Sequence, residues 1–249
     1  LRDAVVAPGT SPIAQQYVQG MGFGDFDGDG DRDALVHVGA FNNPPIAPGV
    51  LNLLQVAPGR FALGTFAFAE ATDRLMPAAY WRCFDRDLDG DDVPDLVVTT
   101  DLPLGASTSI DRASIYRGSA SGAFTFVANL DRTVKAIADF DGDQRPDLLL
   151  ARDYSGYSVA RNQGAFTFVA PVTIATLQIQ SRADRIAIGD LDGDGDLDIA
   201  VPERTSTPAT DTVRLVRNDG AMNFATLPRS PAFPDFDCFL APGTHAFAF

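Results

Sequence analysis

The sequence is poor in several residue types that direct attention to particular chemistry. Its 249 residues include two cysteines, two histidines, one tryptophan and one lysine, Lys135. Neither cysteine has a second cysteine or histidine at metal-ligand spacing, so zinc is not predicted. Cys83 and Cys238 lie far apart, and the sequence leaves open both a disulfide and two free thiols. There is no run of 18 apolar residues, which excludes a predicted transmembrane helix.

Positive charge is also scarce. The 19 Lys and Arg residues face 33 Asp and Glu residues, which gives a net charge of −14. Without a basic patch to offset this charge, nucleic acid is not expected as a partner. The acids are concentrated, because 19 of the 33 lie in four nine-residue segments. Four bound divalent ions would bring the net charge from −14 to −6. The acidity therefore predicts cation sites.

The four segments, 25–33, 87–95, 139–147 and 190–198, share one pattern. Each has Asp at positions 1, 3, 5 and 9 and Gly at position 4. So many carboxylates repel one another unless a cation lies among them, and hard oxygen ligands favour calcium. We interpret each segment as a calcium loop, about four ions in all. The predicted side-chain ligands are Asp25, Asp27, Asp29 and Asp33; Asp87, Asp89, Asp91 and Asp95; Asp139, Asp141, Asp143 and Asp147; and Asp190, Asp192, Asp194 and Asp198.

Two other interpretations of the loops are weaker. An EF-hand needs a bidentate Glu at position 12 of its loop, where this chain has Val36, Val98, Leu150 and Val201. Simple polar turns rich in Asp and Gly could explain one copy, but not four with the same placement of aspartate.

The loops also mark an internal repeat. Their first aspartates are separated by 62, 52 and 51 residues, and short β-rich segments flank each loop. A second pair of strands follows, joined by a Gly-containing turn, and the last strand is expected to carry alternating aromatic residues, such as Phe166 and Phe168 after Gly164. The sequence predicts an all-β fold, a β-propeller with four-stranded blades in one domain, 1–249. The predicted repeats are 17–79, 80–133, 134–184 and 185–228. Residues 1–16 and 229–249 are expected to close a fifth blade, and an open arc of four blades is the alternative.

The loops and their flanks carry a family resemblance. The segment from Gly22 to Gly30, with its echoes 138–143 and 189–195, resembles the FG-GAP or VCBS-type repeats of integrin α-subunit propellers and of many secreted bacterial proteins. The resemblance covers residues 17 to about 226. It implies that each loop joins the inner two strands of a blade. It also implies a main-chain carbonyl ligand at position 7, which would come from Asp31, Val93, Arg145 and Asp196.

Signals for catalysis are weak. His37 and His245 lie in predicted strands without a nucleophile pattern nearby, and 118–122 is not a nucleophile elbow because its central residue is alanine. The dense carboxylate pairs all belong to the loops. The chain is therefore expected not to be an enzyme.

A partner surface is expected on the rim opposite the calcium loops, where the connections between the second and third strands emerge. These carry aromatic, amide and guanidinium groups suited to a protein or glycan ligand, namely Phe41, Asn42, Asn43, Tyr154 and Arg204. The expected function is a calcium-binding interaction or adhesion module, extracellular or at the cell surface, with a periplasmic location also open. The alternatives are a carbohydrate-binding lectin and an accessory domain of a larger secreted enzyme.

Overall fold

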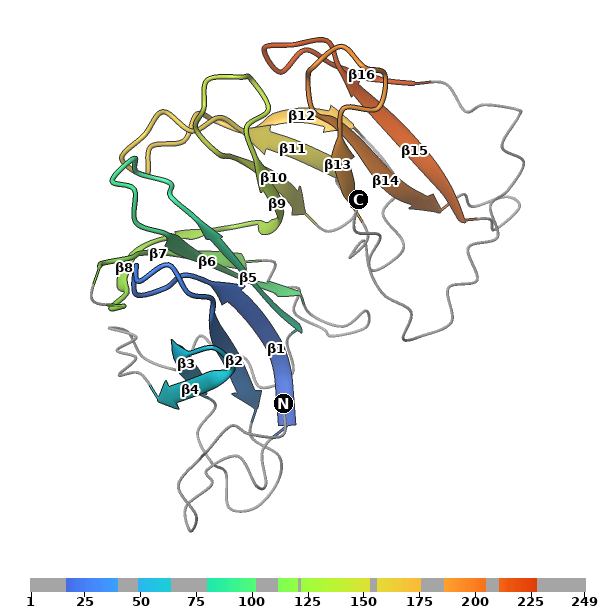
Figure 1. Ribbon diagram of the computed structural model, residues 1–249. Coiled ribbons are helices and arrows are strands. Elements are labelled where there is room, and N and C mark those ends of the chain that lie inside the picture. Colours follow the sequence, from blue (N-terminus) through green and yellow to red (C-terminus); the bar gives the residue numbers. More distant parts are fainter. Residues whose placement is uncertain are drawn as a thin grey trace. The chain divides into compact units, whose positions relative to one another are not determined.

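A computed structural model describes residues 17–39, 49–63, 80–101, 112–120, 122–152, 156–175, 186–204 and 211–227. In these ranges the chain consists of strands, turns and bends, with no helix. The strands form four separate antiparallel sheets of four strands each (Figure 1). The chain divides into two compact units, Leu1–Val134 and Lys135–Phe249, and each is described by itself.

The first unit contains two sheets. The first sheet has the order β1-β2-β3-β4 and the second the order β5-β6-β7-β8. The strands of the first are β1 (Tyr17–Gly24), β2 (Asp33–Gly39), β3 (Gly49–Ala57) and β4 (Arg60–Leu63). Those of the second are β5 (Tyr80–Arg86), β6 (Asp95–Asp101), β7 (Arg112–Arg117) and β8 (Thr125–Leu130). Strands β1 and β5 lie against each other.

The second unit repeats this plan, with sheet orders β12-β11-β10-β9 and β13-β14-β15-β16. The third sheet comprises β9 (Thr133–Ala138), whose first two residues belong to the first unit, β10 (Asp147–Arg152), β11 (Gly156–Ala160) and β12 (Val172–Ala175). The fourth comprises β13 (Ala187–Gly189), β14 (Asp198–Arg204), β15 (Asp211–Asn218) and β16 (Phe224–Thr226).

The predicted order of strands, loop and turn is present in every sheet. The aspartate loop joins the first strand to the second, and the register closes directly beside it, as in the pairs Gly24 with Asp33 and Gly189 with Asp198. Sheets of this kind are the blades of a β-propeller, so the predicted fold class is confirmed. The five-blade count stays a prediction, because 1–16 and 229–249 lie outside the described residues.

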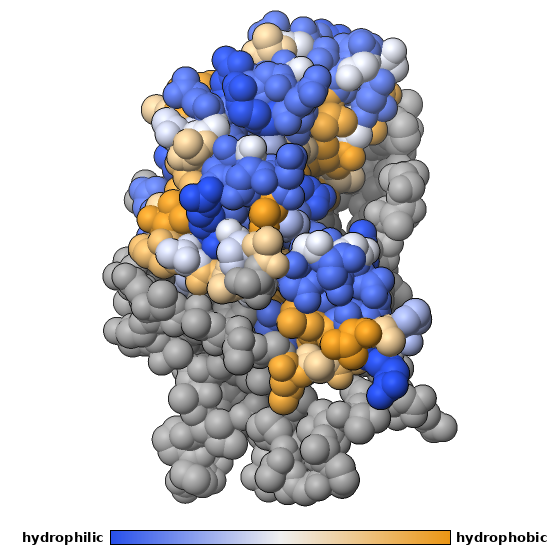
Figure 2. All heavy atoms as spheres, turned by 60° about the vertical axis from the view of Figure 1, so that its left-hand side comes forward, coloured by the Kyte–Doolittle hydropathy of each residue, from blue (hydrophilic) through white to orange (hydrophobic). Residues whose placement is uncertain are grey.

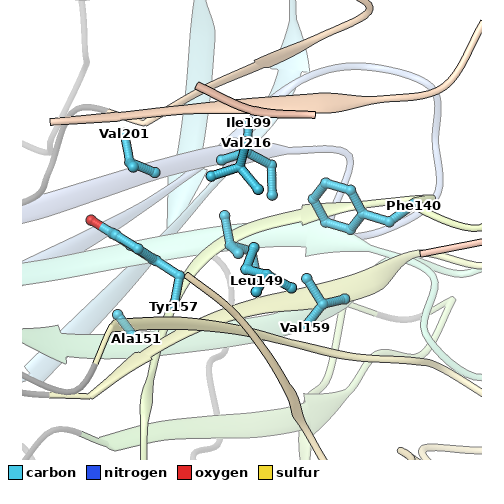
Figure 3. Close-up of a cluster of buried hydrophobic side chains, with 9 residues drawn as sticks. Phe140, Leu149, Ala151, Tyr157, Val159, Ile199, Val201 and Val216 are labelled. Atoms are coloured by element: carbon cyan, nitrogen blue, oxygen red, sulfur yellow. The ribbon is translucent and has the colours of Figure 1, made fainter. Parts of the chain in front are cut away.

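In the second unit, the third and fourth sheets share a core. Leu149 and Val159 of one sheet point toward Ile199 and Val216 of the other, and Tyr157 lies beside them (Figure 3). All five side chains are buried. In β10 and β11 of the third sheet, consecutive residues are buried, as Leu148, Leu149 and Leu150 are, so both faces are removed from water. Such burial stabilises the fold by roughly 1.5–3 kcal/mol per large side chain.

In the first and third loops, the second residue packs against the following sheet. Phe26 contacts Phe124 edge-on, with ring centroids 5.8 Å apart, and Phe140 contacts Phe224 in the same way at 5.9 Å. Both partners follow the Gly turn of the next sheet. These two loops thus also anchor one blade to the next.

One part of the strand prediction was wrong. Phe166 and Phe168 were expected to lie in the last strand of the third repeat, but that strand is β12, which begins at Val172. Phe166 instead has a positive φ of 57° in a turn, and Phe168 forms only an isolated bridge with Asn162. The turn continues past Gly164 to Thr167, whose N–H binds the carbonyl of Gly164 at 2.9 Å, so the strand starts later.

Candidate metal-binding loops

The first aspartate of each loop folds the turn. Its two carboxylate oxygens accept backbone N–H groups from positions 4 and 6. In the first loop, Gly28 N lies 2.8 Å from Asp25 Oδ1 and Gly30 N lies 3.0 Å from Asp25 Oδ2. The other three loops repeat this pair of bonds around Asp87, Asp139 and Asp190. Such local side-chain bonds are the reason that Asp favours turns.

Positions 4 and 6 lie in the left-handed region of φ. Position 4 is always glycine, whereas position 6 is glycine in the first and fourth loops, Asp92 (φ 65°) in the second and Gln144 (φ 68°) in the third. The change to non-glycine residues keeps the turn but holds a side chain in a conformation that costs about 1–2 kcal/mol. The second and third loops therefore keep the same turn with a strained backbone at position 6.

The ninth-position aspartates, Asp33, Asp95, Asp147 and Asp198, are buried in every loop. Each carboxylate accepts two backbone N–H groups, one from loop position 2 and one from the end of the third strand. Asp147 accepts the N–H of Phe140 at 3.0 Å and that of Asn162 at 2.8 Å. The same pair of bonds occurs in the other three sheets. The ninth residue therefore links the loop to its own sheet.

The carboxylates that come together differ between loops. In each loop, three aspartates place one oxygen each within 4.8 Å of the others. The first and fourth loops use positions 1, 3 and 5, namely Asp25, Asp27 and Asp29, and Asp190, Asp192 and Asp194. The second and third use positions 1, 3 and 9, namely Asp87, Asp89 and Asp95, and Asp139, Asp141 and Asp147. The position-5 residues Asp91 and Asp143 are not in these groups.

A feature that the sequence analysis missed is an arginine at the end of the third strand, in three of the four sheets. Arg117, Arg161 and Arg217, called the third-strand arginines from here on, each precede the residue whose N–H binds the ninth aspartate. The first sheet has Leu54 at this position, because there Gln55 donates the N–H. The repeated Arg at equivalent strand ends was the signal that could have revealed it.

Two third-strand arginines bind loop aspartates in the same way. Arg117 Nε lies 2.9 Å from Asp89 Oδ2, and its Nη2 lies 2.8 Å from Asp91 Oδ2. Arg161 likewise pairs through Nε with Asp141 and through Nη2, at 3.1 Å, with Asp143. Each guanidinium thus joins positions 3 and 5 of one loop.

The other loop contacts of arginine differ. In the third loop, Arg145 at position 7 also pairs with Asp143, so this loop has two guanidinium partners. In the fourth sheet, Arg217 is held by Asp219, with Nε 2.7 Å from Oδ1 and Nη2 3.1 Å from Oδ2.

Burial and these partners set the protonation of the loops. Burial raises the pKa of Asp95 and of Asp147 to about 6. The two backbone N–H groups that each carboxylate accepts act to lower the pKa, but burial has the larger effect. Hydrogen bonding to Arg117 lowers the pKa of Asp91. For Asp143, burial acts to raise the pKa, but the bonds from Arg145 and Arg161 outweigh it and the pKa is lowered. The carboxylates of Asp91 and Asp143 are thus held in the charged form.

The donor set fits calcium. Each loop supplies three closely spaced carboxylate oxygens from separate residues and offers no nitrogen or sulfur ligand among them. In the second and third loops a guanidinium already lies between two of the aspartates, which shows that the loop attracts a cation. The aspartates of each group would hold the ion, which would neutralise their repulsion and fix the turn.

Other predicted site residues are placed only in part. Asp31, Val93, Arg145 and Asp196, the expected carbonyl ligands, all lie within the turns, and their role stays a prediction. Of the expected partner surface, Phe41, Asn42, Asn43 and Tyr154 lie outside the described residues, whereas Arg204 is the last residue of β14. Cys83 lies in β5 and Cys238 lies outside the described residues.

The sheets and their loops define a class, a β-propeller of four-stranded blades with aspartate-rich loops between the first two strands. Comparison with protein families supports this, because residues 139–201 match the FG-GAP-like repeat. That segment includes the whole of the third and fourth loops. The resemblance stated from the sequence is confirmed.

Comparison with solved structures agrees on the fold. The chain is similar to the structure described as the structural basis of specific recognition of non-reducing terminal N-acetylglucosamine by a lectin of Agrocybe aegerita. The TM-score is 0.57 at 16% sequence identity, with 84% of this chain and 52% of that chain covered. The chain thus spans about half the length of that protein. No curated protein sequence matches this chain. None of the described residues forms a helix able to cross a membrane.

Proposed function

We propose that this chain is a non-catalytic binding module, a β-propeller whose blades are stabilised by calcium. The observation that carries the proposal is the fourfold recurrence of one loop, with three carboxylate oxygens within 4.8 Å of one another in each copy. Four such loops in equivalent places of four sheets indicate a structural role. A catalytic site would need one distinctive loop.

The position of the loops explains what calcium would stabilise. The loop joins two strands through the ninth aspartate and joins two blades through its second residue, as the bonds of Asp147 and the stacking of Phe140 show. An ion that draws the carboxylates together would therefore stiffen both a hairpin and a contact between blades. Because it binds the folded loop preferentially, it raises stability by mass action.

The proposed location follows from the same chemistry. Loops of weak to moderate affinity fill where calcium is near millimolar, outside the cell. We therefore place the module outside the cell, at the cell surface or in the periplasm, where it would serve in adhesion or in a surface assembly.

The partner surface would be the rim away from the calcium loops. In an antiparallel sheet, the connection from the second to the third strand leaves from the opposite end to the loop, as β2 and β3 illustrate. Of the residues predicted to bind, Arg204 ends the second strand of its sheet, and the others fall in sequence between the second and third strands. Much of the described surface is hydrophilic, with apolar side chains scattered over it (Figure 2), and this suits recognition by loops.

A second candidate is carbohydrate binding. It is favoured by the similarity of the fold to that of a lectin that recognises terminal N-acetylglucosamine, and by the amide and aromatic residues of the predicted partner surface. The site that would bind a sugar in this chain is proposed to include Asn43 and Tyr154.

The calcium proposal is tested by thermal denaturation and calorimetry of the full chain. Calcium is expected to raise the melting temperature, and a chelator to lower it again, with magnesium as the matched ion control. If calcium neither binds nor shifts the melting curve, the proposal is wrong.

A glycan array separates the two kinds of partner. Binding to one class of sugar that is lost in Asn43→Ala or Tyr154→Ala supports the lectin. Loss of binding is informative only if the variant keeps the melting temperature of the unmodified protein. An array without binding leaves the protein-interaction module as the proposal.

A further inference from the structure

The aspartate loops divide into two classes according to their arginines. In the second and third loops, a third-strand arginine pairs with positions 3 and 5. In the first loop the equivalent residue is Leu54, and in the fourth Arg217 pairs with Asp219 outside the loop.

The carboxylate groups divide in the same way. Where a guanidinium pairs with position 5, that aspartate is absent from the clustered oxygens and position 9 takes its place. In the first and fourth loops, where no guanidinium of the described residues pairs with position 5, that aspartate stays in the cluster with positions 1 and 3. The ion pairs and the clustered oxygens therefore divide the loops in the same way.

From this we infer that the third-strand arginines are built-in competitors for calcium, which grade the affinities of the four loops. The inference rests on the proposed calcium function and adds a regulation of that site. A guanidinium is a cation that cannot lose its proton, and it pairs with an oxygen of each of the two carboxylates that a calcium ion would need. Calcium must release or reposition the arginine to recruit position 5.

The number of guanidinium partners predicts the order of filling. The third loop has four aspartates and two partners, Arg145 and Arg161, and should bind most weakly. The second has five aspartates and one partner, Arg117. The fourth loop has five aspartates, and its arginine, Arg217, pairs with Asp219 outside the loop. The first loop has five and Leu54 in place of the arginine, so it should bind most tightly.

The size of the effect follows from the exposure of the pairs. The arginine side chains are about half exposed, 52% for Arg117 and 47% for Arg161. Exposed ion pairs are weak, because water and salt screen them and the long side chains lose freedom. Each arginine makes two such pairs, so removing one arginine is expected to tighten calcium binding at its loop by about tenfold. Salt screens such pairs, so the difference between loops should shrink as ionic strength rises.

The glycine at position 4 supplies a reporter in every loop. Gly28, Gly90, Gly142 and Gly193 each donate their N–H to the first aspartate. Selective ¹⁵N-glycine labelling therefore allows calcium titration of the full chain, followed by NMR, with one amide signal for each loop. Each signal is assigned by its loss on substitution of that glycine by alanine.

Arg161→Gln is the first test variant, because it removes the charge but keeps a polar side chain. The midpoint of Gly142 is expected at about tenfold lower calcium, with that of Gly193 unchanged. Leu54→Arg is the converse variant and is expected to move the midpoint of Gly28 to about tenfold higher calcium. The matched control is Arg132→Gln, which makes the same change in net charge directly before β9, at the end of the strand away from the loop.

The outcomes are distinct. If no glycine responds to calcium in the unmodified protein, both the calcium function and this inference fail. If the glycines respond but Arg161→Gln weakens the third loop or leaves it unchanged, the arginine positions the carboxylates and does not compete, and only this inference fails. An equal shift with Arg132→Gln would also overturn it, because net charge alone would then explain the change. Should Arg161→Gln not fold, Leu54→Arg decides.

Discussion

The second residue of the aspartate loop allows a comparison of identical substitutions at equivalent positions. Leu88 in the second loop is 1% exposed, whereas Leu191 in the fourth is 54% exposed. Both residues donate their backbone N–H to the ninth aspartate of their loop, at 2.7 Å and 2.8 Å. The two sites therefore differ in what covers the side chain and not in its local bonds.

Substitution of each leucine by alanine should separate these sites. At Leu88 the change removes buried methyl groups and leaves a cavity, which costs about 2–5 kcal/mol. At Leu191 half of the side chain is already in water, so the same change should cost about 1 kcal/mol or less. For a chain of this size the difference corresponds to melting temperatures that differ by several degrees, since 1 kcal/mol shifts the midpoint by about 2–4 °C.

The assay is thermal denaturation followed by circular dichroism at saturating calcium, so that loop occupancy is the same in both variants. Chemical denaturation with an unchanged dependence on denaturant confirms that the folded state alone has changed. If Leu191→Ala lowers the free energy of unfolding as much as Leu88→Ala does, the side chain of Leu191 is buried in the native protein. A further segment must then cover the fourth sheet, as the expected fifth blade would.

Three further predictions concern the loops themselves. Gln144→Gly should raise stability by about 0.5–1 kcal/mol, because relief of the positive φ outweighs the greater freedom of glycine in the unfolded chain. Gly142→Ala should lower stability by a similar amount. Its Cβ would meet no atom within 4 Å, so the positive φ alone would cause the loss. In the presence of a chelator, Asp95 and Asp147 have a pKa of about 6 in the folded state, against 3.8 in the unfolded chain. Their protonation therefore contributes fully to stability at low pH, and this contribution is lost as the pH rises through 6. Melting temperatures at pH 5 and pH 7 measure the loss, and a higher melting temperature at pH 7 would contradict it. Gly118→Ala should cost about 1–3 kcal/mol in urea denaturation, because its Cβ would lie 2.0 Å from the carbonyl oxygen of Pro94, and a neutral result would exclude this close approach.

The strands and loops were predictable because their signals are local. A short β-rich segment, a fixed aspartate spacing and a glycine turn recur every 51 to 62 residues, and each repeat confirms the others. The positive φ at position 6 was not visible at Gln144, since nothing in its chemistry favours that conformation. Only the alignment with the glycines of the first and fourth loops placed it in a turn.

The turns between the third and fourth strands show where local reasoning failed. Gly164 and Gly220 have positive φ as expected, but so do the two residues that follow each glycine. The asparagines before them have a different role. Asn162 binds the carbonyl of Pro146 at 3.1 Å, and Asn218 binds that of Phe140 at 2.8 Å. The asparagines thus tie the turn to an aspartate loop, a contact that depends on the fold.

The third-strand arginines were missed for the same reason. Arg117 lies 26 residues from Asp91, and Arg161 lies 18 residues from Asp143, so no motif within one loop contains both partners. Their repetition at equivalent strand ends was visible, but a charged residue at a strand end is usually solvated. The guanidinium reaches the loop only because the strands pair. The first sheet has Leu54 where the other sheets have an arginine, so the loops differ in their guanidinium partners.

The contacts within a loop divide its aspartates by task. At positions 1 and 9, both carboxylate oxygens accept backbone N–H groups. These residues therefore fold the turn and attach it to the sheet, as Asp139 and Asp147 do. Positions 3 and 5, such as Asp141 and Asp143, are the ones that meet a guanidinium. A repeat can therefore retain its fold through positions 1 and 9 while the demand for an external cation is adjusted at positions 3 and 5. On this reasoning the affinity of a loop is set by the strand beside it, and the aspartate pattern alone does not fix it.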